Sequence, residues 1–529
     1  MNSQEFITQH VKVLKPLSKK LALAYWKASI SGSDEDFKEY EELAKELKKI
    51  FNNKEEFEKT KTLFSQEQDP ITKRQLKILH NEYLSSQGDL DLINQIIEKE
   101  TKVEQKFNKF RANLEGKELT DNDIKEILKS ETDSQKLQAA WEASKKQGEL
   151  VEKDMLEIIK LRNNLAKSLG FKNYYEFSLQ VSEQKPEEII STFQELADLT
   201  NKPFAKLKDE INTALSEKYN ISKEDLKPWH HQDLFFQEGP EIYKIDINDI
   251  YANHNVVKIA EEFYKGIGIP VTDVLEKSDL YEKPGKSQHA FCIAIDREGD
   301  VRILQNVKNN EKWMETTLHE LGHAIYSKLV CTPKLPYLLR DQAHIFTTEA
   351  IALLFGRKSK DLSFIKKYCQ KEDPSLAEKL PKALRLRQLV FSRWTQVMVN
   401  FERQFYENPD QDLNKLWWSL VTKHQLIPFS RDKPDWASKM HFVAAPVYYH
   451  NYMLGELLAS QIHHHITKNI LNQDSLKNVD YSGKKEIGLY LQKHIFEQGM
   501  KCKWDEMIKK ATGEELTPEY YVEEFVEGA

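Results

Sequence analysis

METTLHELGHAIYSKLV, residues 314–330, is the stretch of the chain that bears on both its fold and its chemistry. Apolar residues recur in it at three- and four-residue spacing, as on the buried face of a helix: Met314, Leu318, Leu321, Ile325 and Leu329. Asn309 or Asn310 can cap the start, because an asparagine side chain accepts hydrogen bonds from the free N–H groups of a first turn. We therefore predict an amphipathic helix over this stretch.

Two histidines in this stretch, His319 and His323, lie four residues apart. At that spacing both rings project from the same face of a helix and can bind one metal ion. Glu320 follows the first histidine, so its carboxylate can take a proton from a water molecule at that ion. Together they form the HExxH pattern of zinc peptidases. A surface helix with two histidines and no metal is the alternative interpretation.

A catalytic zinc ion needs a third protein ligand and one open position. The segment DQAHIFTTEAIALLFG, residues 341–356, offers His344 and Glu349 on a second predicted helix that ends at Gly356. Glu349 lies 349 − 323 = 26 residues after the second histidine. We predict that Glu349 completes a site for one Zn²⁺ per chain. His344 is expected to support the site or to pack in the core.

The residue pattern changes at residues 288–307, where QHAFCIAID and DVRILQNV flank a turn at Gly299. Both runs are rich in β-branched or aromatic residues, which indicates a β-hairpin. Elsewhere helical periodicity dominates, for example over residues 35–50 and 186–217. The predicted fold class is therefore mainly α, with one small antiparallel sheet.

Composition narrows the possible partners and locations. The 529 residues are 40% apolar and 30% charged, with a formal net charge of −7, which argues against binding to nucleic acid. The N-terminal residues lack the apolar core of a secretory signal. The sequence contains no run of about 18 apolar residues, so no membrane span is predicted. The four cysteines form no CxxC pair. We expect a cytoplasmic protein without a membrane partner.

With these motifs in place, the chain resembles gluzincin metallopeptidases of the angiotensin-converting enzyme family and of the thimet oligopeptidase/oligoendopeptidase F family. RNNLAKSLGFKNYYEFSL at 162–179 and HFVAAPVYYHNYMLGEL at 441–457 add to the resemblance. It implies an elongated, two-lobed helical peptidase with a deep central channel that admits short unfolded peptides. We expect residues 1–225 to form the channel wall or lid and residues 226–529 the zinc-containing lobe, intertwined as one monomeric or weakly dimeric unit.

The segment 441–457 holds candidates for stabilising the transition state. Pro446 fits the first turn of a helix on which Tyr449 and Tyr452 would share a face. In the resembling family, a histidine followed by paired tyrosines stabilises the tetrahedral intermediate, and His441 and these two tyrosines match that order. The register leaves two other candidates open for these places, Tyr448 and His450. An aromatic core helix is the alternative interpretation.

Substrate-binding residues are also implied by the resemblance. In angiotensin-converting enzyme a lysine placed like Lys439 binds the terminal carboxylate of the substrate. A surface lysine is the alternative, and the choice separates release of C-terminal dipeptides from internal cleavage. The strand that contains His289 and Ala290 would pair with an extended substrate backbone. A purely structural hairpin is the alternative there.

The chain departs from the family at Leu353, where angiotensin-converting enzyme has an aspartate that supports a zinc histidine. We expect a backbone carbonyl or His344 to replace it. The predicted function is a zinc oligopeptidase with Glu320 as the base. A peptidyl-dipeptidase, a peptide-binding relative without turnover and a zinc hydrolase of other amides remain alternatives.

Overall fold

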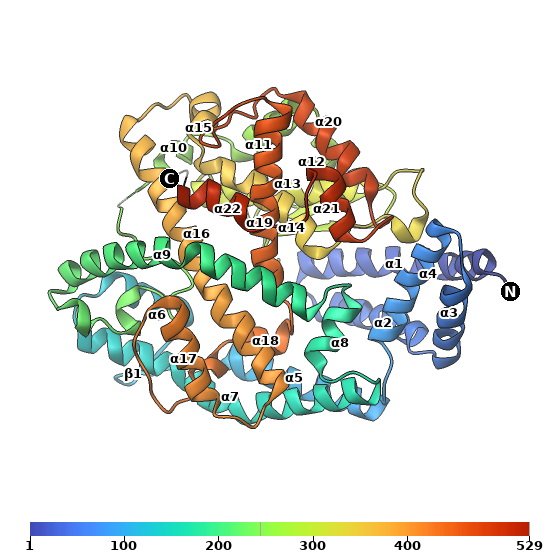
Figure 1. Cartoon of the computed structure of the whole chain (residues 1–529), viewed down its shortest axis with the longest axis horizontal. Coiled ribbons are helices and arrows are strands. Elements are labelled where there is room, and N and C mark those ends of the chain that lie inside the picture. The colour runs from blue at the N-terminus through green and yellow to red at the C-terminus, as the bar shows by residue number, and fades with distance from the viewer. Residues whose placement is uncertain (244, 528–529) are drawn as a thin grey trace. The chain divides into compact units, whose positions relative to one another are not determined.

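The structure is a computed structural model that describes residues 1–243 and 245–527. Helices make up most of the chain, and its strands form two short hairpins (Figure 1). The prediction of a mainly α fold is confirmed. Among the described residues, no helix combines the length and the apolar character needed to cross a membrane.

Two compact units divide the chain, and their segments alternate along the sequence. Unit 1 comprises Met1–Gln87, Asp246–Ala377 and Leu454–Glu524. Unit 2 comprises Gly88–Ile245, Glu378–Met453 and Phe525–Ala529. This division differs from the predicted boundary at residue 225, because the residues that follow it pack inside unit 2. Trp229, for example, lies with its ring centroid 5.9 Å from that of Trp141.

Unit 1 begins with four helices: α1 (Ser3–Ser31), α2 (Asp34–Phe51), α3 (Lys54–Gln66) and α4 (Pro70–Ser85). The second of them confirms the helix predicted over 35–50. Apolar side chains of α1 and α4, among them Phe6 and Leu79, form one cluster with Leu338 from the 3₁₀ turn Tyr337–Leu339. This cluster ties the N-terminal helices to the segment between the two helices that carry the histidine and glutamate motifs.

The predicted hairpin is present in unit 1 as β3 (Phe291–Ala294) and β4 (Val301–Leu304). The strands are antiparallel, with Cys292 opposite Ile303. Gly299 lies in the connecting turn at φ +109°, a conformation that favours glycine. The motif helices follow as α13 (Glu311–Leu329) and α14 (Ile345–Gly356), and they pack against each other.

Shorter helices complete unit 1: α10 (Asn248–Ala252), α11 (Val256–Gly266), α12 (Thr272–Lys277), α15 (Leu362–Cys369), α20 (Lys485–His494), α21 (Trp504–Thr512) and α22 (Glu519–Val522). Two further helices cross the unit boundaries, α16 (Pro374–Glu407) and α19 (His450–His465). Buried Tyr264 of α11 donates a hydrogen bond from its hydroxyl to the Leu318 carbonyl of α13, at 2.6 Å. The motif helix α13 is thus stabilised by a tertiary hydrogen bond as well as by its own amphipathic pattern.

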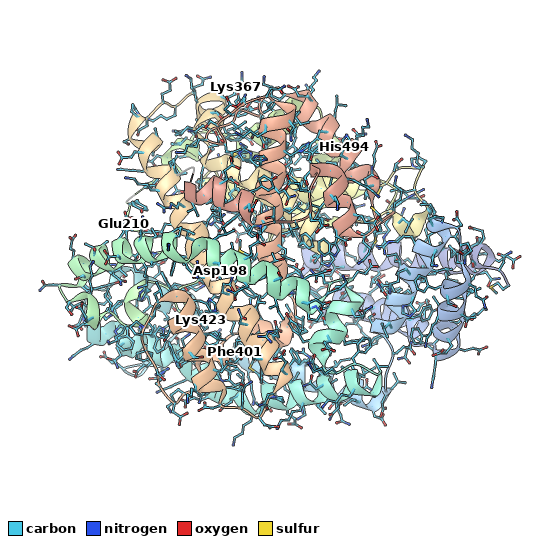
Figure 2. The ribbon with its side chains drawn as sticks, viewed as in Figure 1. Asp198, Glu210, Lys367, Phe401, Lys423 and His494 are labelled. Carbon is cyan, nitrogen blue, oxygen red and sulfur yellow. The ribbon has the colours of Figure 1, made fainter. Side chains whose placement is uncertain are left out.

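Unit 2 contains α5 (Leu90–Lys109), α6 (Asp121–Ser130), α7 (Ser134–Ser168), α8 (Tyr174–Val181), α9 (Pro186–Tyr219), α17 (Leu413–Gln425) and α18 (His441–Ala444). Its hairpin, β1 (Ala112–Leu114) and β2 (Lys117–Leu119), was not predicted, because three-residue strands carry too little periodicity to be recognised. Helix α9 confirms the prediction for 186–217. Figure 2 shows its charged side chains Asp198 and Glu210, both exposed, whereas Phe401 of α16 is fully buried.

Candidate metal centre

The motif helix α13 forms as its sequence predicts. Of the two candidate caps, Asn310 is the one used, and its side chain accepts a hydrogen bond from the Trp313 N–H at 2.9 Å. Four residues of the predicted apolar face have no exposed surface: Met314, Leu318, Leu321 and Ile325. The fifth, Leu329, is half-buried. The opposite side of the helix carries His319 and His323, both half-buried.

Gly322, inside the HExxH motif, explains how closely α13 approaches α14. A Cβ atom at this position would lie 2.7 Å from the Cα atom of Ala352. Such a contact is too short for any side chain, so the two backbones can meet only at a glycine. This close approach places Glu349, one turn before Ala352, across from both histidines.

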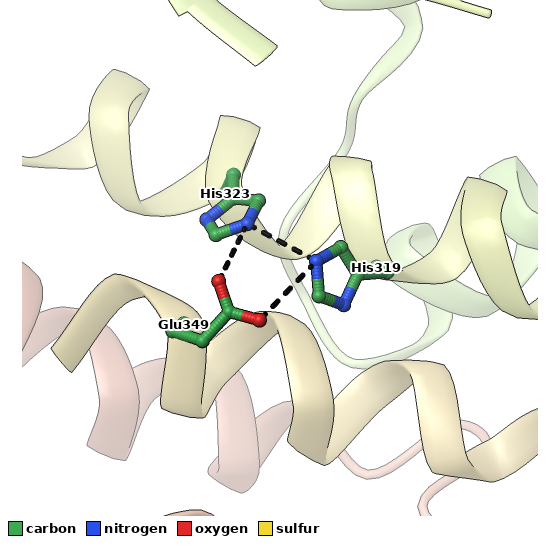
Figure 3. Close-up of side chains that lie close together, drawn as sticks. All are labelled: His319, His323 and Glu349. Carbon is green, nitrogen blue, oxygen red and sulfur yellow. Dashed lines mark hydrogen bonds and ion pairs between the residues drawn. The ribbon is translucent and has the colours of Figure 1, made fainter. Parts of the chain in front are cut away.

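His319, His323 and Glu349 converge on one point between the two helices (Figure 3). The Nε2 atoms of the histidines lie 3.2 Å apart, and the glutamate oxygens lie 3.7 Å from His319 Nε2 and 3.6 Å from His323 Nε2. Ligands about 2.0–2.1 Å from a tetrahedral zinc ion are separated by roughly 3.3 Å. Both the donor types and their spacing therefore fit zinc. In the described ranges, no second group of His, Cys, Asp and Glu meets the same criterion.

Thr348 supports the second histidine. Its hydroxyl lies 2.8 Å from Nδ1 of His323, the ring nitrogen that faces away from Glu349. The expectation of a backbone carbonyl or His344 is thus wrong for this ring. His344 instead caps α14, where its Nδ1 atom accepts a hydrogen bond from the Phe346 N–H. No pattern in the sequence distinguishes Thr348 from the neighbouring Thr347. Which of the two threonines reaches His323 depends on how α14 is oriented against α13.

Glu320, the proposed base, is buried beside the three donors, with 7% of its surface exposed. Burial raises its pKa to about 8, and the nearby Glu349 carboxylate adds to the effect. Burial also lowers the pKa of His323 to about 4, which leaves this ring neutral at pH 7, as a metal ligand must be. A divalent cation among these groups would favour ionised Glu320 and Glu349.

Helix α19 packs directly against the Glu349 side chain. A Cβ atom at Gly455 would lie 3.1 Å from Cγ of Glu349, so glycine permits the approach. The next residue, Glu456, is buried and forms an ion pair with Arg357, which also pairs with Glu524 at 3.1 Å. Glu349 is therefore bounded by a third helix as well as by the two histidines.

The predicted substrate strand is only partly where the sequence suggested. Strand β3 begins at Phe291, so the exposed His289 and half-buried Ala290 precede it. One edge of β3 pairs with β4, and among the described residues no other strand pairs with β3. Burial raises the pKa of the Cys292 thiol on this strand, and the nearby Glu320 carboxylate adds to the effect. A peptide backbone added to β3 would pair with residues from Phe291 onward.

The candidate tyrosines lie in unit 2, and the helix predicted to carry them does not begin at Pro446. Pro446 and Val447 form a turn, and α19 begins only at His450. The prediction of a helix start at Pro446 is wrong, because Val447 adopts φ +53°, which no right-handed helix accommodates. Its N–H group donates to Oε1 of the buried Glu402 side chain at 2.7 Å, a tertiary contact that local sequence rules cannot predict.

Of the three predicted catalytic side chains of unit 2, Tyr449 nevertheless packs against the other two. The ring centroid of His441 lies 5.1 Å from that of Tyr449, which lies 5.3 Å from that of Tyr452. The Tyr449 hydroxyl accepts a hydrogen bond from Trp394 Nε1 at 2.5 Å. The alternative His450 is buried and forms a hydrogen bond with Gln184, at 2.8 Å.

Lys439 is buried, with 8% of its surface exposed, so the alternative of a surface lysine is wrong. Its ammonium group donates to the Gln237 side-chain carbonyl at 2.7 Å and lies 5.1 Å from the ring centroid of Trp394. Burial lowers its pKa to about 8. Sequence reasoning missed Gln237, because the two partners lie 202 positions apart in the chain.

Comparison with known proteins extends over nearly the whole chain. The family model described as angiotensin-converting enzyme matches residues 1–523. No curated protein sequence matches the chain. The matched range includes the three metal-ligand candidates of unit 1 and the histidine–tyrosine group of unit 2.

Proposed function

The chain belongs to the angiotensin-converting enzyme family of peptidases, and from this premise we propose that it is a zinc-dependent oligopeptidase that hydrolyses short, unfolded peptides. The observation that carries the proposal is the convergence of His319, His323 and Glu349, with their donor atoms within 4.8 Å of one another. These residues would hold one Zn²⁺ per chain. A protein that only binds peptides would not need buried Glu320 beside them.

Zinc, when bound there, would lower the pKa of water and polarise a carbonyl oxygen. Glu320 takes the proton of the attacking water and delivers it to the leaving amine. Its burial beside Glu349 keeps the carboxylate away from bulk water, and a bound divalent cation would keep it ionised and able to accept the proton. Thr348 keeps the His323 ring oriented while this occurs.

His441, Tyr449 and Tyr452 are proposed to donate hydrogen bonds to the oxygen that becomes negative as the peptide carbonyl is attacked. Tyr449 suits this role because its hydroxyl accepts from Trp394, which leaves its own proton for another acceptor. Burial raises the pKa of Tyr449, so the hydroxyl stays protonated at neutral pH. Burial lowers the pKa of His441 to about 4, so its ring is neutral there.

A specific observation favours a second candidate function, the release of C-terminal dipeptides. Lys439 is buried among aromatic rings, and its hydrogen-bond partner is the neutral amide of Gln237 rather than a carboxylate. A buried cation with such a partner is suited to the terminal carboxylate of a peptide. The free-acid and amidated forms of one peptide separate the candidates. Lys439→Gln should raise KM for the acid alone if this function operates.

The proposed function is tested by metal analysis followed by incubation with a mixed peptide library. Cleavage sites are identified by mass spectrometry, with Glu320→Gln as the matched control because it keeps the size of the side chain and loses the base. We expect about one zinc per chain and cleavage that the variant lacks. A protein without zinc affinity, or equal cleavage by Glu320→Gln, would end the proposal.

Short peptides are the only partners we propose, and we propose a monomer or weak dimer in the cytoplasm. The four cysteines are free thiols, as is usual in a reducing compartment. Size-exclusion chromatography with light scattering over a range of concentrations tests the oligomeric state. A stable, concentration-independent oligomer would contradict that part.

A further inference from the structure

The residues that link His441 to Tyr449 comprise the rest of the short helix α18 and the turn that follows it, and we call them the 442–448 turn. The backbone of this segment is strained at one position. Val447 has φ +53° and is 5% exposed. A β-branched side chain in the left-handed region is a true outlier, because its Cβ substituents crowd the backbone. Such a conformation persists only where its surroundings over-determine it, and it is often found at functional sites. The contacts that hold this turn are therefore informative.

Helix α16 holds the C-terminal end of the turn. Glu402 of this helix is 4% exposed, and Oε1 of its carboxyl group accepts the Val447 N–H at 2.7 Å. Eight residues earlier on the same helix, Trp394 donates to the Tyr449 hydroxyl. One helix thus fixes both the strained amide and the hydroxyl of the tyrosine two residues later.

Helix α7 holds the N-terminal end of the turn through Arg162, which is 2% exposed. Its two Nη atoms donate to the carbonyls of Phe442 and Val443, each at 2.7 Å. These carbonyls lie at the end of the short helix α18, where backbone acceptors have no partner within the helix. Glu100 and the Tyr406 hydroxyl hold the guanidinium from its other sides, at 2.6 and 3.0 Å.

We propose that Arg162 and Glu402 are positioning residues that clamp the 442–448 turn so that His441 and Tyr449 are presented together to the reacting peptide. The inference rests on the catalytic roles proposed for those two residues. This positioning role explains why the strained conformation of Val447 is maintained. Glu402 binds the N–H group of Val447, the strained residue. If the φ angle of Val447 relaxed to a common value, the backbone would approach Tyr449 from another direction and its side chain would turn.

The clamp makes a prediction that a merely structural contact does not. Loss of the Glu402 acceptor should leave substrate affinity intact. It should slow the step in which negative charge develops on the carbonyl oxygen, because only the orientation of the donors His441 and Tyr449 changes. Glutamine at this position keeps an oxygen that can accept the Val447 N–H, whereas alanine removes it. Glu407 of the same helix, exposed and paired with Arg403, provides a matched control.

The experiment compares Glu402→Ala, Glu402→Gln and the control Glu407→Gln as full-length, zinc-loaded proteins. Amide hydrogen exchange is followed over residues 442–450, and kcat, KM and zinc content are measured. We expect Glu402→Ala to exchange at least tenfold faster in this segment. Its kcat should fall ten- to a hundredfold, with KM within twofold and zinc unchanged. Glu402→Gln and Glu407→Gln should stay close to wild type.

Unchanged kcat in Glu402→Ala, with or without faster exchange, overturns the clamp. If this variant does not fold, Arg162→Lys replaces it, because lysine cannot bind two carbonyls with one planar fork. A wild-type kcat in that variant likewise overturns the proposal. Failure of the proposed function looks different: wild-type protein would then show no turnover that depends on Glu320. The positioning role would fall with it, whereas the exchange data would still report whether Glu402 holds the turn.

Discussion

The Thr348 hydroxyl lies 2.8 Å from Nδ1 of His323, on the far side of the ring from the Glu349 carboxylate. Helix α14 thus touches both nitrogens of one imidazole with consecutive residues. With a metal bound at Nε2, Nδ1 would carry the ring proton and donate a hydrogen bond to the hydroxyl oxygen. Leu353, four residues after Glu349, has no polar group that could replace this contact.

Removal of that hydroxyl should weaken zinc binding. We expect Thr348→Ala to lower zinc affinity about 10–100-fold, the usual effect of losing a hydrogen bond to a ligand histidine. Competition with a chromogenic chelator measures the affinity without any reference to turnover. Thr348→Ser, which keeps the hydroxyl, should restore most of it. Equal affinities in the alanine variant and in wild type would show that the contact does not orient the ring.

Tyr452→Phe should separate catalysis from metal binding. Loss of one donor to the developing oxyanion typically costs about 3–4 kcal/mol, or two to three decades in kcat. The zinc content should not change, since the three ligand candidates are untouched. Steady-state kinetics on a fluorogenic peptide, with zinc analysis of the same sample, provide the check. A wild-type kcat would remove Tyr452 from the mechanism.

Two glycines should respond differently to alanine. At Gly322 the new Cβ would lie 2.7 Å from a backbone atom of α14, which cannot move alone, so we expect a loss of about 1–3 kcal/mol in the free energy of unfolding together with weaker zinc binding. At Gly455 the Cβ would meet the Glu349 side chain at 3.1 Å. There zinc affinity should fall with a smaller change in stability. Thermal unfolding without metal and chelator competition separate the two effects, and identical behaviour of the variants would contradict this account.

Glu402 should make stability depend on pH. Burial raises its pKa from 4.5 to about 8, so the folded state binds this proton more tightly than the unfolded state does. Its contribution to stability is therefore complete below about pH 4.5 and is lost as the pH rises through about 8, at about 1.4 kcal/mol per pKa unit. The other titratable groups facing it are Arg162, Tyr174, Tyr175 and Tyr406. Arg162 stays charged, and burial raises the pKa of each tyrosine, so none of them titrates in this window.

Glu402→Gln has no such proton, so its stability relative to wild type should rise by a few kcal/mol between pH 5 and pH 9. Urea unfolding of both proteins at several pH values measures the difference. Glu407→Gln, exposed on the same helix, should run parallel to wild type. A constant difference between Glu402→Gln and wild type across this range would show that the carboxyl group titrates normally.

Local sequence was sufficient for the features that depend on neighbouring residues. The spacing of His319 and His323 places both rings on one helix face, because the helical repeat is set by backbone hydrogen bonds alone. The caps and apolar faces of the helices and the hairpin around Gly299 follow from equally short-range rules. The sequence by itself therefore determined the fold class and two of the three ligand candidates, and it suggested the third from its place on a second helix.

The tertiary structure decided everything that depends on which surfaces meet. Close approach at Gly322 brings Glu349 to the histidines and selects Thr348 as the partner of His323. Packing within unit 2 buries Lys439 against Gln237. A hydrogen bond to Glu402 holds Val447 in a conformation that its own residue type disfavours. Such contacts join residues far apart in the chain, and their free energy outweighs local preference only once the surrounding helices have assembled.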